Sequence, residues 1–257
     1  MKPFHPTVAV LLTIAALYNG NLHAQYSDAD SSWKNSRKNI VRYNLSGGLL
    51  FGIDKYVVFG YERVIKPHQS LSLNVGRAAL PKLVSINTDS FSVSKDLKNT
   101  GFNISLDYRF YLAKENKYVA PHGLYIGPYI AYNNFKRDNN WTFKKGTAQA
   151  KEVSTATDIN IFTVGGELGY QFILWKRLAL DLVLIGPGLS RYDLSGKIDG
   201  ELTEEQKEKL RDVMTQVISQ KFPGMNYVFA DKSFDANGTL NTTSIGFRYM
   251  VHIGFVF

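Results

Sequence analysis

The chain has 257 residues and no cysteine, and its 30 lysines and arginines outnumber its 22 aspartates and glutamates, for a formal net charge of +8. The lack of cysteine excludes a disulfide framework, a metal–thiolate site, a thiol nucleophile and a lipidated cysteine. The positive charge is not gathered in a nucleic-acid-binding motif. Basic loops that face phosphorylated lipid head groups explain it better.

The first 24 residues are predicted to be a signal peptide. Lys2 gives a short basic region, residues 7–17 (TVAVLLTIAAL) form a continuous apolar run, and Leu22-His23-Ala24 fits a signal-peptidase site. The apolar run is too short to span a membrane in the mature chain, although a retained membrane anchor is the alternative. Cleavage after Ala24 leaves enough residues for one domain of eight strands with long loops.

Residues 25–39 are polar and without pattern, and are predicted to form a flexible periplasmic lead-in. Beyond them, apolar and polar residues alternate in eight stretches, and a period of two predicts β-strands. Ten strands are the alternative, if residues Asn226–Phe229 pair locally. The expected limits of the eight strands are 40–51, 55–66, 70–79, 100–112, 122–135, 157–174, 177–192 and 241–257.

One face of each predicted strand is apolar or aromatic, and the other is small or polar. In the sixth stretch, for example, Thr163 stands between Phe162 and Val164. Such strands are typical of a transmembrane β-barrel with lipid outside and polar groups inside. Arg77 and Pro128 interrupt the pattern, which a bulge or a position at the membrane edge would accommodate. A soluble lipocalin-like barrel is the alternative, because alternation does not say which face is in water.

The connections between the strands are expected to alternate in length. In a barrel that starts and ends in the periplasm, the even-numbered connections are short periplasmic turns and the odd-numbered ones are outer loops. The even-numbered connections centre on residues 66–69, 113–121 and 175–176. The third, fifth and seventh connections run over about residues 80–99, 136–156 and 193–240, and only the first outer connection, 52–54, is short.

The seventh connection is expected to contain the one helix of the chain, over residues 201–222. Thr203 and Gln206 fit a capping box, and Leu210 and Met214 belong to a run of apolar residues at helical spacing. The helix is therefore predicted to be amphipathic. It either packs its apolar stripe on the barrel rim or the outer leaflet, or it acts as a lid or a docking site for a partner.

Alternation places seven charged side chains inside the barrel. An eight-stranded barrel is just wide enough for side chains to fill, so three cations and four carboxylates predict a paired, hydrogen-bonded plug. A path that conducts protons or ions is the alternative. The seven residues are Arg42, Glu62, Asp107, Arg109, Glu167, Asp181 and Arg248.

A lipid-modifying enzyme is a further alternative that the histidines do not favour. His68 and His122 fall in predicted periplasmic turns, and His252 falls near the periplasmic end of the last strand, so none reaches the outer rim. Asp107 and Glu167 could serve as acid and base, but their spacing is not diagnostic. The chain lacks HExxH, GxSxG and P-loop patterns. We therefore assign no catalytic, cofactor-binding or metal-binding residue and expect no cofactor.

The last strand ends on Phe257, two places after Phe255. A terminal strand with aromatic residues at these positions resembles the signal that the barrel-assembly machinery of Gram-negative bacteria reads. Across residues 40–257 the pattern is similar to that of the small OmpA/OmpX-type barrels, in the outer membrane protein β-barrel domain family. This resemblance implies a location in the outer membrane of a Gram-negative bacterium, with both termini in the periplasm.

We expect a non-enzymatic barrel with a plugged interior, which acts structurally or through surface interactions of its outer loops; a narrow channel or transport barrel is the alternative. The fifth connection carries Lys144 and Lys145 close to Trp141 and Phe143. Cations interleaved with aromatic rings suit the membrane interface, where they meet lipopolysaccharide phosphates. The expected partners are outer-membrane lipids and lipopolysaccharide, the assembly machinery and an extracellular partner.

Overall fold

The computed structural model describes residues 37–79, 91–116, 118–143, 150–221, 235 and 238–257. The predicted signal peptide, residues 1–24, and most of the predicted lead-in lie outside the described residues. So do Lys144, Lys145 and the segment Asn226–Phe229.

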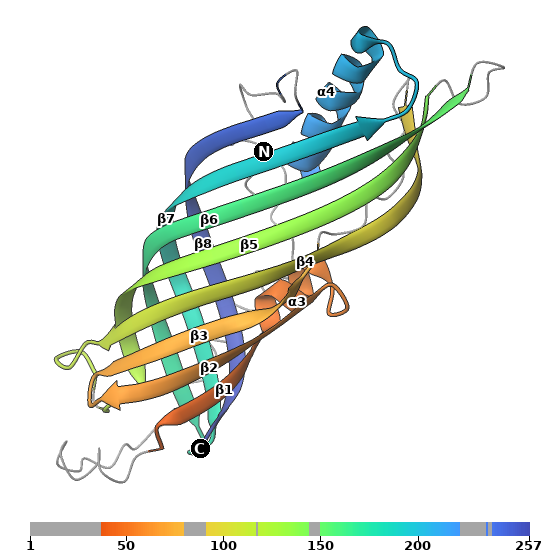
Figure 1. Cartoon of the computed structure of the whole chain (residues 1–257). Helices are drawn as coiled ribbons and strands as arrows, with labels where there is room; N and C mark the ends of the chain where they lie inside the picture. The colour runs from red at the N-terminus through yellow and green to blue at the C-terminus, as the bar shows by residue number, and fades with distance from the viewer. Residues whose placement is uncertain (1–36, 80–90, 117, 144–149, 222–234, 236–237) are drawn as a thin grey trace, which may run out of the picture.

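Eight antiparallel strands close into a ring in sequence order (Figure 1). This ring confirms the predicted eight-stranded antiparallel barrel. The strands are β1 (Asn39–Asn44), β2 (Tyr56–Lys66), β3 (Gln69–Ala78), β4 (Phe91–Tyr111), β5 (Gly123–Phe143), β6 (Lys151–Leu174), β7 (Leu178–Asp199) and β8 (Thr239–Val256).

The register around the ring fixes the tilt of the strands. A path from one Cα partner to the next starts at Gly254 of β8 and crosses to Arg42 of β1. It then passes through β2 to β7 in order and returns to β8 at Ser244. The path has moved ten residues along β8, from position 254 to position 244. Such a stagger requires strongly tilted strands and leaves an interior that side chains can fill.

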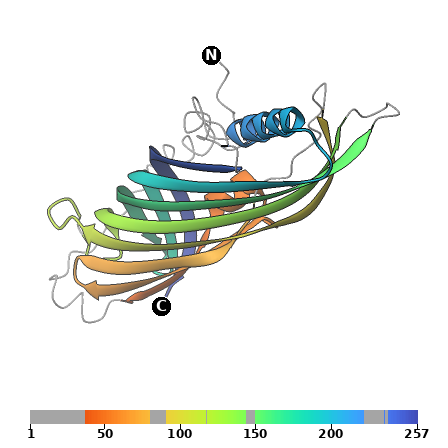
Figure 2. The ribbon, with the colours of Figure 1, turned by 45° about the horizontal axis from the view of Figure 1, so that its top comes forward.

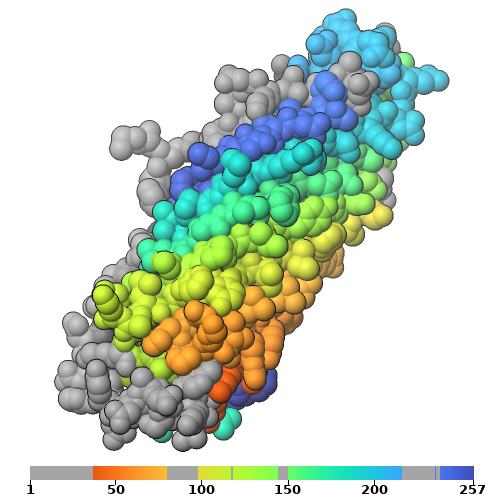
Figure 3. Space-filling view, turned by 60° about the vertical axis from the view of Figure 1, so that its left-hand side comes forward, coloured from red at the N-terminus to blue at the C-terminus, as the bar shows by residue number. Residues whose placement is uncertain are grey.

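The wall of the barrel is much higher on one side than on the other. Strands β1 to β3 have 6 to 11 residues, whereas β4 to β8 have 18 to 24 and continue well past them (Figure 1). On the outer surface the strands lie side by side in sequence order (Figure 3). We call the closed part the barrel section. We call the part beyond it the upper extension, which consists of residues 91–101, 134–143, 151–160, 191–199 and 239–243.

The apolar face of the strands changes side between these two sections. In the barrel section of β6, Phe162 and Val164 face outward and are exposed, while Glu167 faces inward and is buried. In the upper extension of β6, Val153 and Ile159 face inward and are buried. The inversion breaks the expected pattern at the border between the two sections. The predicted strands therefore began at 100 and 157 and ended at 135 and 192, although β4, β5, β6 and β7 all continue past these positions.

The inversion also corrects the predicted loop lengths. The supposed fifth loop, 136–156, is mostly strand, because β5 runs to Phe143 and β6 starts at Lys151. The remaining connection, 144–150, is shorter than the fourth connection, 112–122, so the expected alternation of long and short connections is wrong for this pair. The first connection, 45–55, is longer than the predicted 52–54.

A short helix, α3 (Leu45–Phe51), follows β1. The expectations that the first strand continues to residue 51 and that the chain has one helix are therefore wrong. Asn44 caps α3, since its Oδ1 accepts a hydrogen bond from the Gly47 N–H at 2.9 Å. Gly47 and Gly48 are buried, and a Cβ at Gly47 would overlap the Tyr56 ring. The Asn44 cap and the two glycines thus allow a helical turn after β1. The apolar residues beside the glycines had suggested that the strand continues.

The helix after β7, α4 (Glu204–Lys221), forms as predicted. The capping box is present, since the Thr203 N–H donates to Gln206 Oε1 at 3.1 Å and the Gln206 N–H donates to Thr203 Oγ1 at 3.4 Å. Glu204 accepts a hydrogen bond from Lys207 at 2.8 Å, and this bond holds the pKa of the Glu204 carboxyl below its usual value.

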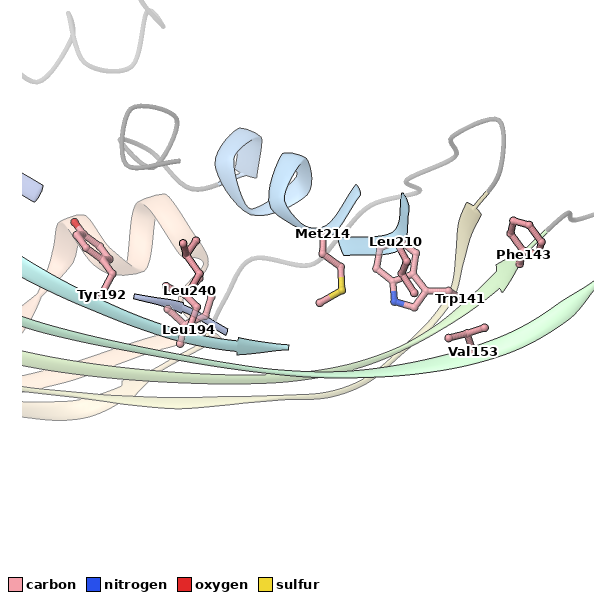
Figure 4. Packing of buried hydrophobic residues seen from close by; sticks show 9 residues of the cluster. Trp141, Phe143, Val153, Tyr192, Leu194, Leu210, Met214 and Leu240 are labelled. Carbon is pink, nitrogen blue, oxygen red and sulfur yellow. The ribbon is translucent and has the colours of Figure 1, made fainter. Parts of the chain in front are cut away.

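The helix α4 lies over the inner face of the upper extension (Figure 2). Its apolar stripe packs on that face. Leu210 and Met214 point from the helix toward the sheet, where they meet Trp141 (Figure 4). The indole Nε1–H of Trp141 donates to Thr155 Oγ1 at 2.8 Å. We call this group the upper cluster; it consists of Trp141, Phe143, Val153, Ile159, Tyr192, Leu194, Leu210, Met214 and Leu240.

Arg77 and Pro128 both occupy positions that tolerate them. Arg77 is exposed at the second-last residue of β3. Pro128 is exposed on the outer face of β5, where the pairing with β4 skips from Asp107–Tyr129 to Phe110–Ile126. Because the ladder is interrupted there, a residue without an N–H costs little.

Candidate functional site

The seven predicted charged residues meet inside the barrel section. They come from β1, β2, β4, β6, β7 and β8, and the alternation of each strand points them inward. Arg248 is the most exposed of the seven, with 14% of its side chain accessible. We call the group the interior network; it consists of Arg42, Glu62, Asp107, Arg109, Glu167, Asp181 and Arg248.

Two arginines of the network share the same two carboxylates. Arg42 Nη1 lies 2.7 Å from Asp181 Oδ2 and 3.3 Å from Glu62 Oε2. Arg109 reaches the same two oxygen atoms at 3.0 and 3.2 Å. Each guanidinium therefore bridges β2 and β7 across the interior, and charge-assisted hydrogen bonds of this kind are among the strongest in proteins.

The third arginine binds the other two carboxylates. Arg248 Nη2 donates to both Asp107 and Glu167, and its guanidinium lies 3.5 Å from the centroid of the Tyr129 ring. Arg42 Nη2 is 3.6 Å from Asp107 Oδ2, and Arg109 Nε is 3.5 Å from Glu167 Oε1. These contacts join all seven charges into one network.

Neutral side chains complete the network, and the sequence analysis did not single them out. Tyr111 donates to Glu62 at 2.9 Å, and Tyr125 donates to Asp181 at 2.7 Å. Gln171 accepts a hydrogen bond from Arg109 at 3.1 Å. The same alternation points these residues inward, so the signal was present in the sequence, but only charged residues were considered.

His252 was also missed as a member of the network. It is buried, and its Nδ1 lies 3.2 Å from Asp181 Oδ2. It pairs across strands with Asn44 and with Asp181 itself. Within the described part of the chain, no three His, Asp or Glu side chains are grouped as metal ligands.

Small residues make room for the arginines. A Cβ built on Gly60 of β2 would overlap the side chains of Arg42 and Asn74, and a Cβ on Gly186 of β7 would overlap Arg248. The glycines thus allow long side chains to fold across a narrow interior. Long charged side chains from opposite strands therefore lie across the interior at this level.

A cavity of about 260 Å³ lies directly above the interior network. Arg248 and Tyr129 form its floor, and they belong to the network or touch it. Tyr192 and Ile161 form its roof and pack in or against the upper cluster. The cavity therefore lies between the polar plug and the apolar cluster that holds α4.

The two terminal aromatic residues lie on the outer face of the barrel section. Phe255 and Phe257 are about half exposed, at 47% and 50%. Phe257 exchanges two backbone hydrogen bonds with Asn39, at 2.8 and 3.0 Å, so the end of the chain closes the ring beside the start of β1. Arg177 lies over the Phe255 ring at 5.6 Å.

The predicted lipid-head site is corrected in part. Lys144 and Lys145 lie outside the described residues. Trp141 and Phe143, which were expected at head-group level beside them, are buried on the inner face of the upper extension, at 1% and 7% exposure. Their alternation continues that of β5, so they face inward, where α4 covers them.

Among the described residues, no helix has the length and apolar character needed to cross a membrane. No family model matches the chain, and no curated protein matches it. Among solved structures, a major outer membrane protein from Thermus thermophilus is similar, with 12% sequence identity and a TM-score of 0.33, over 87% of this chain and 100% of that chain.

Proposed function

We propose that the chain is a non-enzymatic integral outer-membrane β-barrel that acts structurally and through surface contacts of its outer end. One observation carries this proposal: large apolar side chains are exposed on every strand of the barrel section. Exposed apolar surface of this extent is rare on soluble proteins and is normal where lipid covers it. The belt includes Val41, Phe59, Leu73, Val75, Ile104, Leu106, Ile126, Ile130, Phe162, Val164, Leu189, Phe247 and Ile253.

Aromatic residues lie at both borders of this belt, as expected at membrane–water interfaces. At the upper border the rings of Phe102 and Tyr132 are 5.6 Å apart. At the lower border the ring pair Tyr170–Phe172 is 4.4 Å apart, and Trp175 is exposed in the turn that follows. Above Tyr132 the outer face becomes polar, which supports an aqueous environment for the upper extension.

The interior network supports a plugged barrel over the alternative of a narrow channel. Each of its four carboxylates contacts at least one guanidinium, and the side chains cross the interior from opposite strands. An ion would have to break several charge-assisted hydrogen bonds to pass. We therefore place the function at the surface rather than in the interior.

The outer face of the upper extension offers exposed cations to lipopolysaccharide just above the apolar belt, and carboxylates such as Asp138, Glu152 and Asp199 lie among them. Exposed cations there would meet lipid phosphates, as predicted for Lys144 and Lys145. Two of them also pair with neighbouring carboxylates, Lys136 with Asp158 at 3.3 Å and Arg191 with Asp193 at 3.1 Å. The exposed cations on this face are Lys98, Lys136, Arg191 and Lys197.

The proposal is tested by the behaviour of the full chain expressed in a Gram-negative host. We expect the protein in the outer-membrane fraction, with heat-modifiable migration in detergent gels. Deletion of Phe257 should reduce the folded fraction, because the terminal residue closes the ring and belongs to the predicted assembly signal. A protein that stays soluble and monomeric without detergent overturns the proposal. Single-channel conductance steps in planar bilayers overturn the plugged interior.

A further inference from the structure

The cavity above the interior network is bounded below by charged side chains of that network, and Tyr192 and Ile161 line its upper side. Below it, Arg248 is held by Asp107 and Glu167. Above it, Tyr192 continues into the upper cluster, where α4 covers the inner face of the extension. A ligand therefore cannot reach this cavity from below without breaking the interior network.

In the part of the chain that the structure describes, the wall has an opening on the side of the short strands, above the place where α3 packs against β8. The pairing of β1 with β8 ends at Asn44–His252, yet β8 continues to Thr239. Among the described residues, no strand pairs with this edge of β8 beyond His252. Two contacts mark the lower end of the opening: the Val251 N–H donates to Ser46 Oγ at 3.1 Å, and the Asn44 amide is 3.5 Å from the sulfur of Met250.

The cavity reaches this opening from inside. Its lining includes Asn44 and Tyr56 on one side of the opening, and Phe247 and Met250 of β8 on the other. Phe247 belongs to the outer apolar belt and is 56% exposed. Residues on both sides of the opening therefore line the cavity.

The lining of the cavity is rich in neutral hydrogen-bonding groups. Its one cation, Arg248, is already bound to two carboxylates, and the interior network as a whole has one more carboxylate than arginine. This balance disfavours an anionic ligand, whereas amides and hydroxyls both donate and accept hydrogen bonds. The polar neutral groups are Asn44, Asn74, Asn103, Ser105, Asn133, Thr163 and Ser190.

The surface beside the opening is apolar. On the α3 side, Leu49 and Leu50 of the helix are 63% and 68% exposed, and Ile53 after it is 72% exposed. On the β8 side, Ile245 is 63% exposed. An alkyl chain that leaves the cavity through the opening would lie against these side chains and stay out of water.

We propose that the cavity binds the neutral, hydroxyl-rich head group of a single-chain amphiphile, which enters sideways from the membrane between α3 and β8. The volume of about 260 Å³ lies just below the usual range of ligand pockets and suits one sugar-sized head group rather than a large one. The neutral amides and hydroxyls bind the head group, and the apolar residues beside the opening bind the chain. This inference rests on the proposed membrane-spanning barrel.

The test measures retention of small amphiphiles by the folded full chain in lauryldimethylamine oxide micelles, by native mass spectrometry. The probes are octyl glucoside, octyl phosphate and free glucose, and the two octyl compounds are added below their micelle-forming concentrations. We expect one octyl glucoside per barrel, with octyl phosphate and glucose retained at least about tenfold less, because one lacks the neutral hydroxyls and the other lacks the chain.

Two glycine variants provide the matched comparison. Gly246 lines the cavity, and a Cβ there would meet Ser190 Oγ only at 3.5 Å, so Gly246→Leu can fill the cavity without an overlap at the backbone. Gly166 faces the outside of β6, and a Cβ there would meet only Gly127 O, at 3.8 Å. Gly246→Leu should lower octyl glucoside retention at least about tenfold, whereas Gly166→Leu should leave it unchanged.

Several outcomes overturn the inference. If free glucose is retained as strongly as octyl glucoside, the alkyl chain and the opening have no role in binding. If octyl phosphate is retained more strongly than octyl glucoside, the cavity does not prefer a neutral head group. Equal retention by Gly246→Leu and by the unmodified chain places any bound molecule elsewhere. If Gly246→Leu does not fold, Gly246→Ala replaces it and should give a smaller loss of the same sign. Loss of heat-modifiable migration in the unmodified chain instead counts against the membrane-spanning barrel itself.

Discussion

The barrel section and the upper extension are built from the same strands and have opposite polarity. In the barrel section, Arg109 and Glu62 are buried inside and residues such as Leu106 are exposed outside. In the upper extension, Trp141 and Leu194 are buried inside and Asp158 lies on the outer face. The backbone alternation continues through both sections, so only the residue types on the two faces change.

This difference in polarity marks the place where the environment outside the strands changes. A folded chain buries apolar groups away from water and must satisfy every polar group that it buries. In the extension the interior is the only dry place, so apolar residues gather there under α4. In the barrel section the outer face is proposed to be dry, so the interior can hold charges that pair among themselves. The border passes between Asn160 and Phe162 on β6.

The largest effect is expected from breaking the interior network. Arg109→Met leaves Asp181, Glu62 and Glu167 with fewer cationic partners in a buried site. We expect a loss of about 3–5 kcal/mol in the free energy of unfolding, because uncompensated buried charge is costly. Urea titration of the refolded barrel, followed by heat-modifiable migration, measures this loss.

The control for this variant is Arg77→Met, at an exposed position at the upper end of β3. It should change the free energy of unfolding by less than about 0.5 kcal/mol. If the two substitutions lower the free energy of unfolding equally, Arg109 in the interior network stabilises the fold no more than an arginine on the surface.

A smaller and local effect is expected in the upper cluster. Leu210 of α4 is fully buried against Trp141, so Leu210→Ala should weaken the docking of the helix by about 2–5 kcal/mol. Hydrogen exchange should speed up in α4 while the barrel section keeps its protection, because the cluster lies outside the closed ring. If exchange speeds up equally throughout the barrel section, the two sections unfold as one unit and their separation is wrong.

The position of the polarity border predicts the effect of a new charge on the outer face of β6. Leu168→Arg, in the barrel section, should cost about 2–4 kcal/mol, as expected for a cation in the lipid-facing middle of a transmembrane strand. Ala156→Arg, exposed on the same face of the upper extension, should cost less than about 0.5 kcal/mol. Refolding into vesicles with urea titration compares the two. Equal costs would mean that the two outer faces share one solvent.

The barrel section could be predicted from the sequence, because its alternation reports local environment directly. Period-two patterns gave eight strands and pointed Arg42 and Asp181 inward, where they lie 2.7 Å apart. Which carboxylate pairs with which arginine could not be predicted, because it depends on the register and the ten-residue stagger of the ring. His252 was at an inward position but was treated only as a catalytic candidate.

The strands of the upper extension were not predicted from the sequence, and the reason is physical. Trp141 and Phe143 stand among lysines and asparagines, and a pattern whose apolar face has moved inward looks like a loop when lipid-facing strands are expected. The helix α3 was missed for another reason, since its formation depends on the Asn44 cap and on the space that Gly47 leaves for Tyr56. Both depend on tertiary contacts that alternation does not encode. The helix α4 was predictable because its capping box and apolar spacing are local.

The smallest effect compares the same kind of ion pair in the two sections. Arg191 Nε and Asp193 Oδ1 are 3.1 Å apart on the outer face of the upper extension, with 68% and 40% of their side chains exposed. Water and salt screen such a pair, so a double-mutant cycle with Arg191→Met and Asp193→Asn should give a coupling below about 1 kcal/mol. The coupling should fall further as the salt concentration rises, because exposed charges are screened. The Arg109–Glu62 pair of the interior network should show a larger coupling that salt hardly changes, since both side chains are fully buried. A coupling of several kcal/mol between Arg191 and Asp193 would mean that this outer face is not in water, and the inverted polarity of the extension would then need another explanation.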